Sequence, residues 1–136
     1  MGDLETLAKV YLAAANDATD RMIALGLRPD DPAAVGLWQM RLDRFYSQST
    51  SLRRIGATLN DLDAQAQLDA LADKLALIKK STAKAEDTIK TIESIDAAMT
   101  KIAKLIALGS AIVTFVANPV GGVKAVITAL TDLNKS

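Results

Sequence analysis

The sequence predicts an all-α protein: an elongated antiparallel helical bundle or coiled coil, with a long central helix over about residues 62–117 and a C-terminal apolar helical hairpin. Three observations predict this class. Hydrophobic residues make up 50% of the 136-residue chain but aromatic residues only 4%, which is untypical of a β-sandwich. Apolar residues recur at alternating spacings of three and four, as on one face of a helix. Only three prolines and seven glycines interrupt the chain.

The first 61 residues are expected to form amphipathic helices. Gly26 is a candidate C-cap for the first helix, and Asp31 can cap a second helix that begins at Pro32. The polar run 47–51 is a candidate bend, but the apolar face resumes after it, so a break is not required. The apolar faces consist of Leu4, Leu7, Tyr11, Ala14, Ala18, Met22 and Leu25, then Val35, Trp38, Leu42, Phe45, Leu52, Ile55, Leu59 and Leu62.

Residues 62–117 contain no proline and a single glycine, Gly109, so they are expected to form one helix. Its part before residue 105 is expected to be a coiled-coil stalk over 62–104, with a possible kink at the polar run 79–84. An unbroken helix of this length measures about 84 Å at about 1.5 Å per residue. It must therefore bend, associate with another chain or meet lipid. The apolar stripes are Leu68, Leu71, Leu75 and Ile78, then Ile92, Ile95, Met99, Ile102, Ile106, Gly109, Val113 and Val116.

Residues 105–123 form a stretch of 19 positions without a formal charge, bracketed by Lys104 and Lys124. The run Asn118–Gly122 predicts a tight turn, so the segment 105–133 is expected to be a hairpin whose arms are each too short to span a bilayer. Because apolar residues lie on every side of the first arm, it must be surrounded by protein or by lipid. The expected membrane or partner contacts are Leu105, Leu108, Ile112, Phe115, Val116, Val120 and Val123.

The composition excludes several kinds of chemistry. The chain has no Cys, hence neither disulfides nor thiolate ligands, and no His, the commonest general base. Carboxylates at helical spacing, such as Asp17 with Asp20, are typical of solvated faces. We therefore expect no enzymatic activity, no metal and no cofactor. With 16 basic and 16 acidic residues, the chain is not expected to bind nucleic acid.

A second candidate contact lies in the first half of the chain, where all six arginines occur. Trp38, Arg41, Phe45 and Tyr46 are a possible protein contact, since arginine and aromatic residues dominate interface hot spots. The alternative is that Trp38 and Phe45 belong to the core while the arginines are solvated.

The order of amphipathic helices, stalk and apolar hairpin resembles that of the helical pore-forming toxins of the cytolysin type. The resemblance is one of layout, and it implies a hairpin that inserts into a membrane. The leading expectation is thus a non-enzymatic helical protein, of bacterial or phage origin, that acts on a membrane by insertion or pore formation through residues 105–130. The alternative is a soluble interaction module, such as an adaptor, chaperone or immunity-type binder, in which 105–130 is core.

Both expectations treat residues 1–136 as one helical domain, with a lipid bilayer or a protein as partner. The long apolar seam predicts a homo- or hetero-oligomer. The N-terminus carries acidic residues and lacks a basic, then apolar, leader. This pattern predicts a protein that is cytoplasmic, released without a classical signal peptide, or attached to a membrane.

Overall fold

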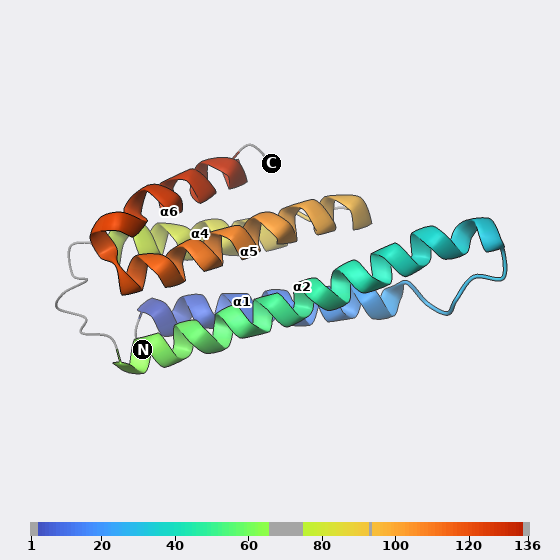
Figure 1. The fold of residues 1–136 in the computed structure, drawn as a ribbon, viewed down its shortest axis with the longest axis horizontal. Helices are drawn as coiled ribbons and strands as arrows, with labels where there is room; N and C mark the ends of the chain where they lie inside the picture. The colour runs from blue at the N-terminus through green and yellow to red at the C-terminus, as the bar shows by residue number, and fades with distance from the viewer. Residues whose placement is uncertain (1–2, 66–74, 93, 135–136) are drawn as a thin grey trace.

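The computed structural model describes residues 3–65, 75–92 and 94–134. This part of the chain folds into helices only, which confirms the predicted all-α bundle (Figure 1). The helices are α1 (Asp3–Ala24), α2 (Pro32–Gln65), α4 (Leu75–Lys90), α5 (Ile95–Ala117) and α6 (Pro119–Asn134).

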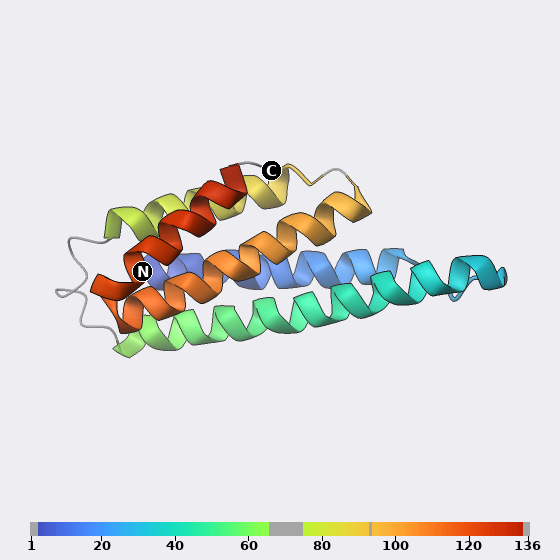
Figure 2. The same ribbon diagram turned by 45° about the horizontal axis from the view of Figure 1, so that its top comes forward.

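The helices pack around α5. α1 and α2 form a long antiparallel hairpin, and α5 lies against this pair, while α4 packs mainly on α1 and α6 mainly on α5 (Figures 1 and 2). α5 therefore has protein on several sides. This arrangement buries the large side chains on one side of residues 105–117 within a single chain, leaves Ile106, Val113 and Val116 half-buried, and exposes the small or polar residues Ala107, Ser110, Thr114 and Ala117.

The connection between α1 and α2 follows the predicted capping residues. Gly26 adopts a φ of 75°, the left-handed conformation that glycine takes at a helix C-terminus. Asp31 Oδ1 accepts a hydrogen bond from the Ala33 amide at 3.0 Å, as an N-cap does. α2 then runs unbroken through the polar stretch 47–51, because one face of that stretch is used for polar contacts: Ser49 Oγ lies 2.8 Å from Thr19 Oγ1 of α1.

The expected single helix over 62–117 is wrong. α4 ends at Lys90 and α5 begins at Ile95, so the stalk expected at 62–104 is divided, and its stripe residues Leu68 and Leu71 lie outside the described residues. Ser94 is the N-cap that starts a new helix. Its backbone is extended, and its Oγ accepts a hydrogen bond from the Ala97 amide at 3.1 Å. No kink occurs at 79–84, where α4 is continuous.

The expected C-terminal hairpin is present, but its turn is shorter than predicted. Asn118 alone separates α5 from α6, and its side chain accepts from the Gly121 amide at 3.2 Å. Gly121 and Gly122 lie inside α6 instead of in a loop. A Cβ on Gly122 would come within 2.5 Å of the Phe115 Cα, so this glycine permits the close approach of the two helices.

The core contains the large apolar side chains of residues 105–115. Of the predicted coiled-coil seam on α5, Ile102 and Gly109 are buried, whereas Ile95, Met99, Ile106, Val113 and Val116 are half-buried. The buried face of α5 therefore overlaps the seam only in part. It consists of Ala98, Ile102, Leu105, Leu108, Gly109, Ile112 and Phe115.

The centre of the bundle is a contact between α1, α2 and α5. The Tyr11 hydroxyl is buried and donates a hydrogen bond to the Leu105 carbonyl. A Cβ on Gly109 would lie 2.8 Å from the Tyr11 ring and 2.7 Å from Ile55 Cγ2. The single glycine of α5 therefore allows a tyrosine ring to lie directly on the helix backbone.

Candidate functional site: an apolar spur at the end of the α1–α2 hairpin

α2 extends beyond the helices that cover it. Arg41 of α2 pairs with Asp96, the second residue of α5, at 3.3 Å, so the residues of α2 before Arg41 lie past the start of α5. α1 also stops early, at Ala24. The connecting loop 25–31 and residues 32–40 of α2 thus project from the bundle as a spur (Figures 1 and 2).

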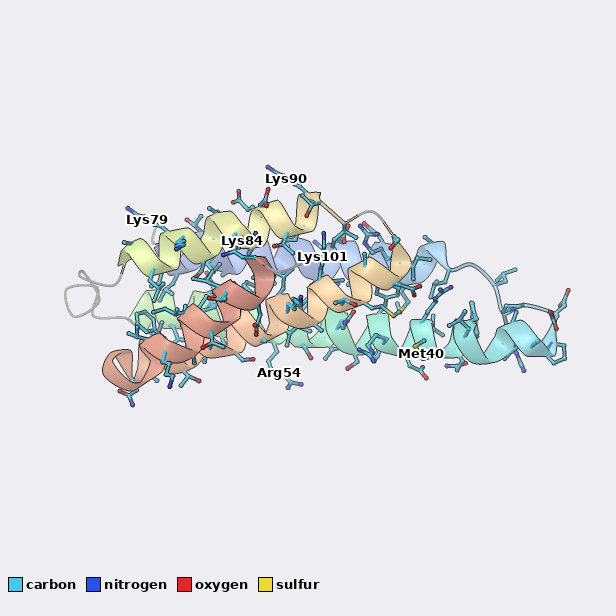
Figure 3. All side chains as sticks on the ribbon, turned by 90° about the horizontal axis from the view of Figure 1, so that it is seen from above. Met40, Arg54, Lys79, Lys84, Lys90 and Lys101 are labelled. Carbon is cyan, nitrogen blue, oxygen red and sulfur yellow. The ribbon has the colours of Figure 1, made fainter. Side chains whose placement is uncertain are left out.

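The spur carries exposed apolar side chains. Leu27 is 93% exposed and Leu37 47%, and Met40, labelled in Figure 3, is 44% exposed. Ile23, in the last turn of α1, is 69% exposed. We name these four residues the tip surface: three lie on the spur, and Ile23 lies at the adjoining end of α1. They are four of the seven exposed large hydrophobic side chains in the described chain. Exposed apolar residues gathered in one place mark binding surfaces more often than scattered ones do.

The loop of the spur is held in one conformation by polar contacts. The indole Nε1 of Trp38 donates to the Gly26 carbonyl at 3.3 Å, which ties the loop back to α2. Asp31 caps α2, and Pro29 and Pro32 restrict the backbone on either side of it. A surface fixed in this way loses little conformational entropy when it binds.

Two charged side chains follow Leu27 in the loop. They are Arg28 and Asp30, and neither has an ion-pair partner within the described chain. Both line an open depression of about 420 Å³, together with Pro29, Pro32 and Val35. The spur therefore presents a protruding leucine, an adjacent hollow and two unpaired charges of opposite sign.

The predicted contact residues of the first half do not form one surface. Phe45 is fully buried in the core, whereas Tyr46 is 65% exposed. Arg41 is engaged with Asp96, and Trp38 is half-buried against the loop. The apolar periodicity of the sequence does not predict the tip surface, because this periodicity follows the core face through Trp38 and Phe45. The available indication was that Leu37 and Met40 lie three residues apart and out of phase with that face.

Four of the seven predicted contacts in the apolar segment lie inside the molecule. Leu105, Leu108, Ile112 and Phe115 are each at most 1% exposed. Val116 and Val123 are half-buried, and the side chain of Val120 lies outside the described residues. Within the described chain, α5 is the one helix long and apolar enough to cross a membrane, a test that the core helix of a soluble bundle also passes.

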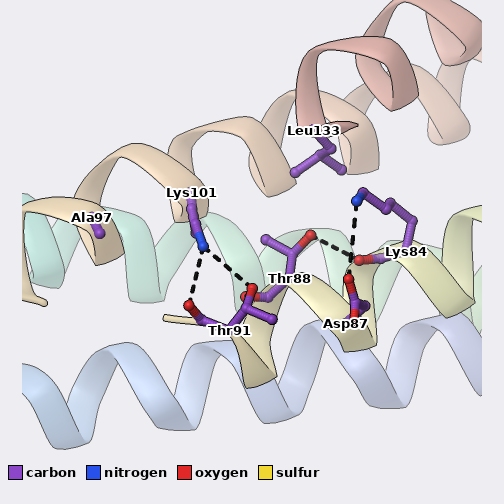
Figure 4. A pocket seen from close by; sticks show the side chains of 7 residues that line it. All are labelled: Lys84, Asp87, Thr88, Thr91, Ala97, Lys101 and Leu133. Carbon is purple, nitrogen blue, oxygen red and sulfur yellow. Dashed lines mark hydrogen bonds and ion pairs between the residues drawn. The ribbon is translucent and has the colours of Figure 1, made fainter. Parts of the chain in front are cut away.

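A second hollow lies between α4, α5 and the end of α6, and its volume is about 330 Å³ (Figure 4). Its polar groups are already paired. Lys101 Nζ donates to the carbonyl and the hydroxyl of Thr91 at 3.1 and 3.2 Å, and Thr88 Oγ1 donates to the Lys84 carbonyl at 2.8 Å. Lys101 thus provides a positive charge and hydrogen bonds at the C-terminal end of α4. The polar groups of this hollow therefore serve as a helix cap, and we do not assign a ligand to it.

Comparisons with known proteins add no family. Neither a protein-family model nor a curated protein nor a solved structure matches this chain. Among the described residues, acidic side chains do not gather into groups of three that would hold a metal ion. The function is therefore argued from the distribution of buried and exposed apolar residues.

Proposed function

We propose that this protein is a non-enzymatic helical interaction module that binds its partner through the tip surface, with residues 105–130 as core. The observation that supports the proposal is a contrast in exposure. Leu105, Leu108, Ile112 and Phe115 are enclosed by the chain's own helices, whereas Leu27 and Ile23 are more than two-thirds exposed. Apolar side chains that the fold could have covered but leaves in water are the ones with free energy to gain from a partner.

The core role of residues 105–130 is tested with a matched pair of lysine variants. Ile112→Lys places an unpaired charge in a fully buried position, and we expect it to unfold the protein, at a cost of about 3–5 kcal/mol. Ile127→Lys changes a half-exposed residue of the same hairpin and should stay folded. Circular dichroism and urea unfolding measure both. A folded Ile112→Lys variant contradicts the proposal.

The binding role of the tip surface is tested by site-specific photo-crosslinking. A benzoylphenylalanine at position 27 or 37, in the cells that naturally make the protein, is expected to give the same discrete adduct from both positions. The same probe at Ile127, which is about as exposed as Leu37 (50% against 47%) but lies on α6, should give none. Adducts absent at 27 and 37, or equally frequent at 127, overturn the assignment of the surface.

A second candidate function is membrane insertion through the α5–α6 hairpin. The observation that favours it is the length and apolar composition of Ile95–Ala117. It predicts that the full-length protein floats with phosphatidylcholine–phosphatidylglycerol vesicles, and that Ile112→Lys abolishes flotation while the protein remains folded. Protein that stays at the bottom of the gradient with neutral and with anionic vesicles removes this candidate.

A further inference from the structure

We infer that the occupant of the tip surface is a second copy of this chain, bound about a two-fold axis at the spur. This inference rests on the proposed function, since it requires the tip surface to be a binding surface. A two-fold interface places the same patch of both copies in contact, so every protrusion must lie beside the feature that receives it. The spur meets this requirement within a few residues.

The loop of the spur combines a protruding leucine with a neighbouring depression. Leu27 protrudes, with 93% of its surface in water. The depression lined by Pro29, Pro32 and Val35 begins two residues further along. A two-fold axis that passes between Leu27 and the depression places the leucine of each copy opposite the depression of the other. Both copies then cover an apolar side chain that neither covers alone.

The loop also carries two charges of opposite sign that could pair between two copies. Arg28 and Asp30 line the same depression and have no ion-pair partner within the described chain. About a two-fold axis, Arg28 of each copy lies opposite Asp30 of the other, which forms two reciprocal pairs. The formal net charge of the chain is zero, so two copies do not repel one another at long range. Two neighbouring carboxylates, Asp30 and Asp31, disfavour burial of the same loop in hydrocarbon.

The size of the surface sets the expected strength. Four apolar side chains from each copy and two ion pairs in the whole dimer are fewer contacts than a standard interface of about 1,600 Å² provides. We therefore expect a reversible dimer with a dissociation constant in the micromolar range, on the order of 10⁻⁵ M.

Sedimentation equilibrium of the purified full-length chain, from about 1 µM to 1 mM, tests the inference across the range in which such a dimer dissociates. We expect a monomer–dimer equilibrium that Leu27→Asp weakens at least tenfold, while Ile127→Asp matches the parent chain. Arg28→Glu should also weaken it, and Arg28→Glu combined with Asp30→Arg should restore it. Circular dichroism confirms that each variant is folded, which is expected because these side chains, Ile127 included, are exposed.

A monomer at every concentration, or a dimer that Leu27→Asp leaves unchanged, overturns the inference. The crosslinking experiment separates this failure from that of the proposed function. Suppose that the adduct at position 27 does not have the mass of two copies of this chain and that the purified protein is monomeric. This result overturns the inference that the occupant is a second copy, but it leaves the tip surface as a binding site. Flotation with vesicles that depends on Leu27 identifies lipid as the occupant and overturns the inference too.

Discussion

The Tyr11 hydroxyl lies within hydrogen-bonding distance, 2.5 Å, of the carbonyl oxygen of Leu105, a residue 94 positions later in the chain. The contact joins the N-terminal hairpin to the apolar C-terminal segment. It requires that α5 present bare backbone to the tyrosine ring, which the glycine at 109 provides. Alkaline pH, Tyr11→Phe and Gly109→Ala each perturb this contact.

Alkaline pH should destabilise the protein through Tyr11. Burial raises the pKa of its phenol above the ordinary value of 10, and the neighbouring Gly109 backbone offsets only part of this. The folded chain therefore keeps this proton while the unfolded chain loses it above about pH 10. The free energy of unfolding is unaffected by this group below pH 10 and falls above it, by about 1.4 kcal/mol per pH unit.

Tyr11→Phe isolates that contribution. At pH 7 the variant should lose about 1 kcal/mol, the net value of a buried hydrogen bond. Above pH 10 its free energy of unfolding should fall less steeply than that of the parent chain. Tyr46→Phe, at a mostly exposed ring, is the control for general effects of alkali. Equal alkaline slopes for the parent chain and Tyr11→Phe would contradict the prediction. Urea titrations between pH 7 and 11.5 give both quantities.

Gly109→Ala should be destabilising although alanine is the better helix former. Its Cβ would come within 2.7–2.9 Å of Ile55 and the Tyr11 ring, both held in the core, and we expect a loss of about 1–3 kcal/mol. Gly36→Ala is the matched control, because nothing lies within 4 Å of a Cβ there and the residue is also helical. It should gain about 0.5–1 kcal/mol. Thermal unfolding should shift in opposite directions for the two variants.

Ser94→Ala should destabilise the start of α5 by about 0.5–2 kcal/mol, because the Ala97 amide loses its acceptor. Ser110→Ala, at an exposed position inside the same helix, should be neutral or slightly stabilising. Hydrogen exchange of the first turn of α5 measures the local effect. Similar exchange in both variants would mean that the break between α4 and α5 is fixed by packing alone.

Gln48 offers a test of a buried polar contact between α2 and α5. Its Nε2 donates to the Met99 carbonyl at 2.8 Å, but its Oε1 is buried and has no hydrogen-bond partner among the described residues. Gln48→Leu should therefore change stability by less than about 1.5 kcal/mol. Gln48→Glu should be strongly destabilising at pH 7, with recovery as acid protonates the introduced carboxyl. A pH-independent loss for Gln48→Glu would show that shape, and not charge, is responsible.

Local chemistry made part of the fold predictable. Gly26, Asp31 and Pro32 act through their own backbone and immediate neighbours, so their capping roles could be inferred from the sequence and are confirmed. The continuity of α2 was left open, because the polar residues at 47–51 do not reveal that Ser49 meets Thr19 of another helix.

The other features of the fold depend on packing between helices that are distant in the chain, so they could not be predicted from the sequence. The glycines at 121 and 122 are typical of a turn, but both lie in α6, and it is the close approach of Phe115 that leaves no room for a Cβ at Gly122. The break near Ser94 interrupts an apolar periodicity that continues across it, so periodicity alone predicts one helix. Whether Leu108 and Ile112 face lipid or protein depended on which helices return to cover α5. The tip surface was missed for the same reason: exposure becomes visible only once the neighbours of α2 are known to end early.

The polar layer at Thr19, Ser49 and Arg53 fixes how far α2 slides along α1, and Arg41 fixes it against α5. The distance from the bundle to Leu27 is thus set by the number of α2 residues before Arg41. Inserting one helical turn there, with the loop lengthened to match, would carry the leucine outward by about 5.4 Å and leave the interior packing untouched. The spur in this sense is a spacer whose reach evolution or an engineer can adjust independently of stability.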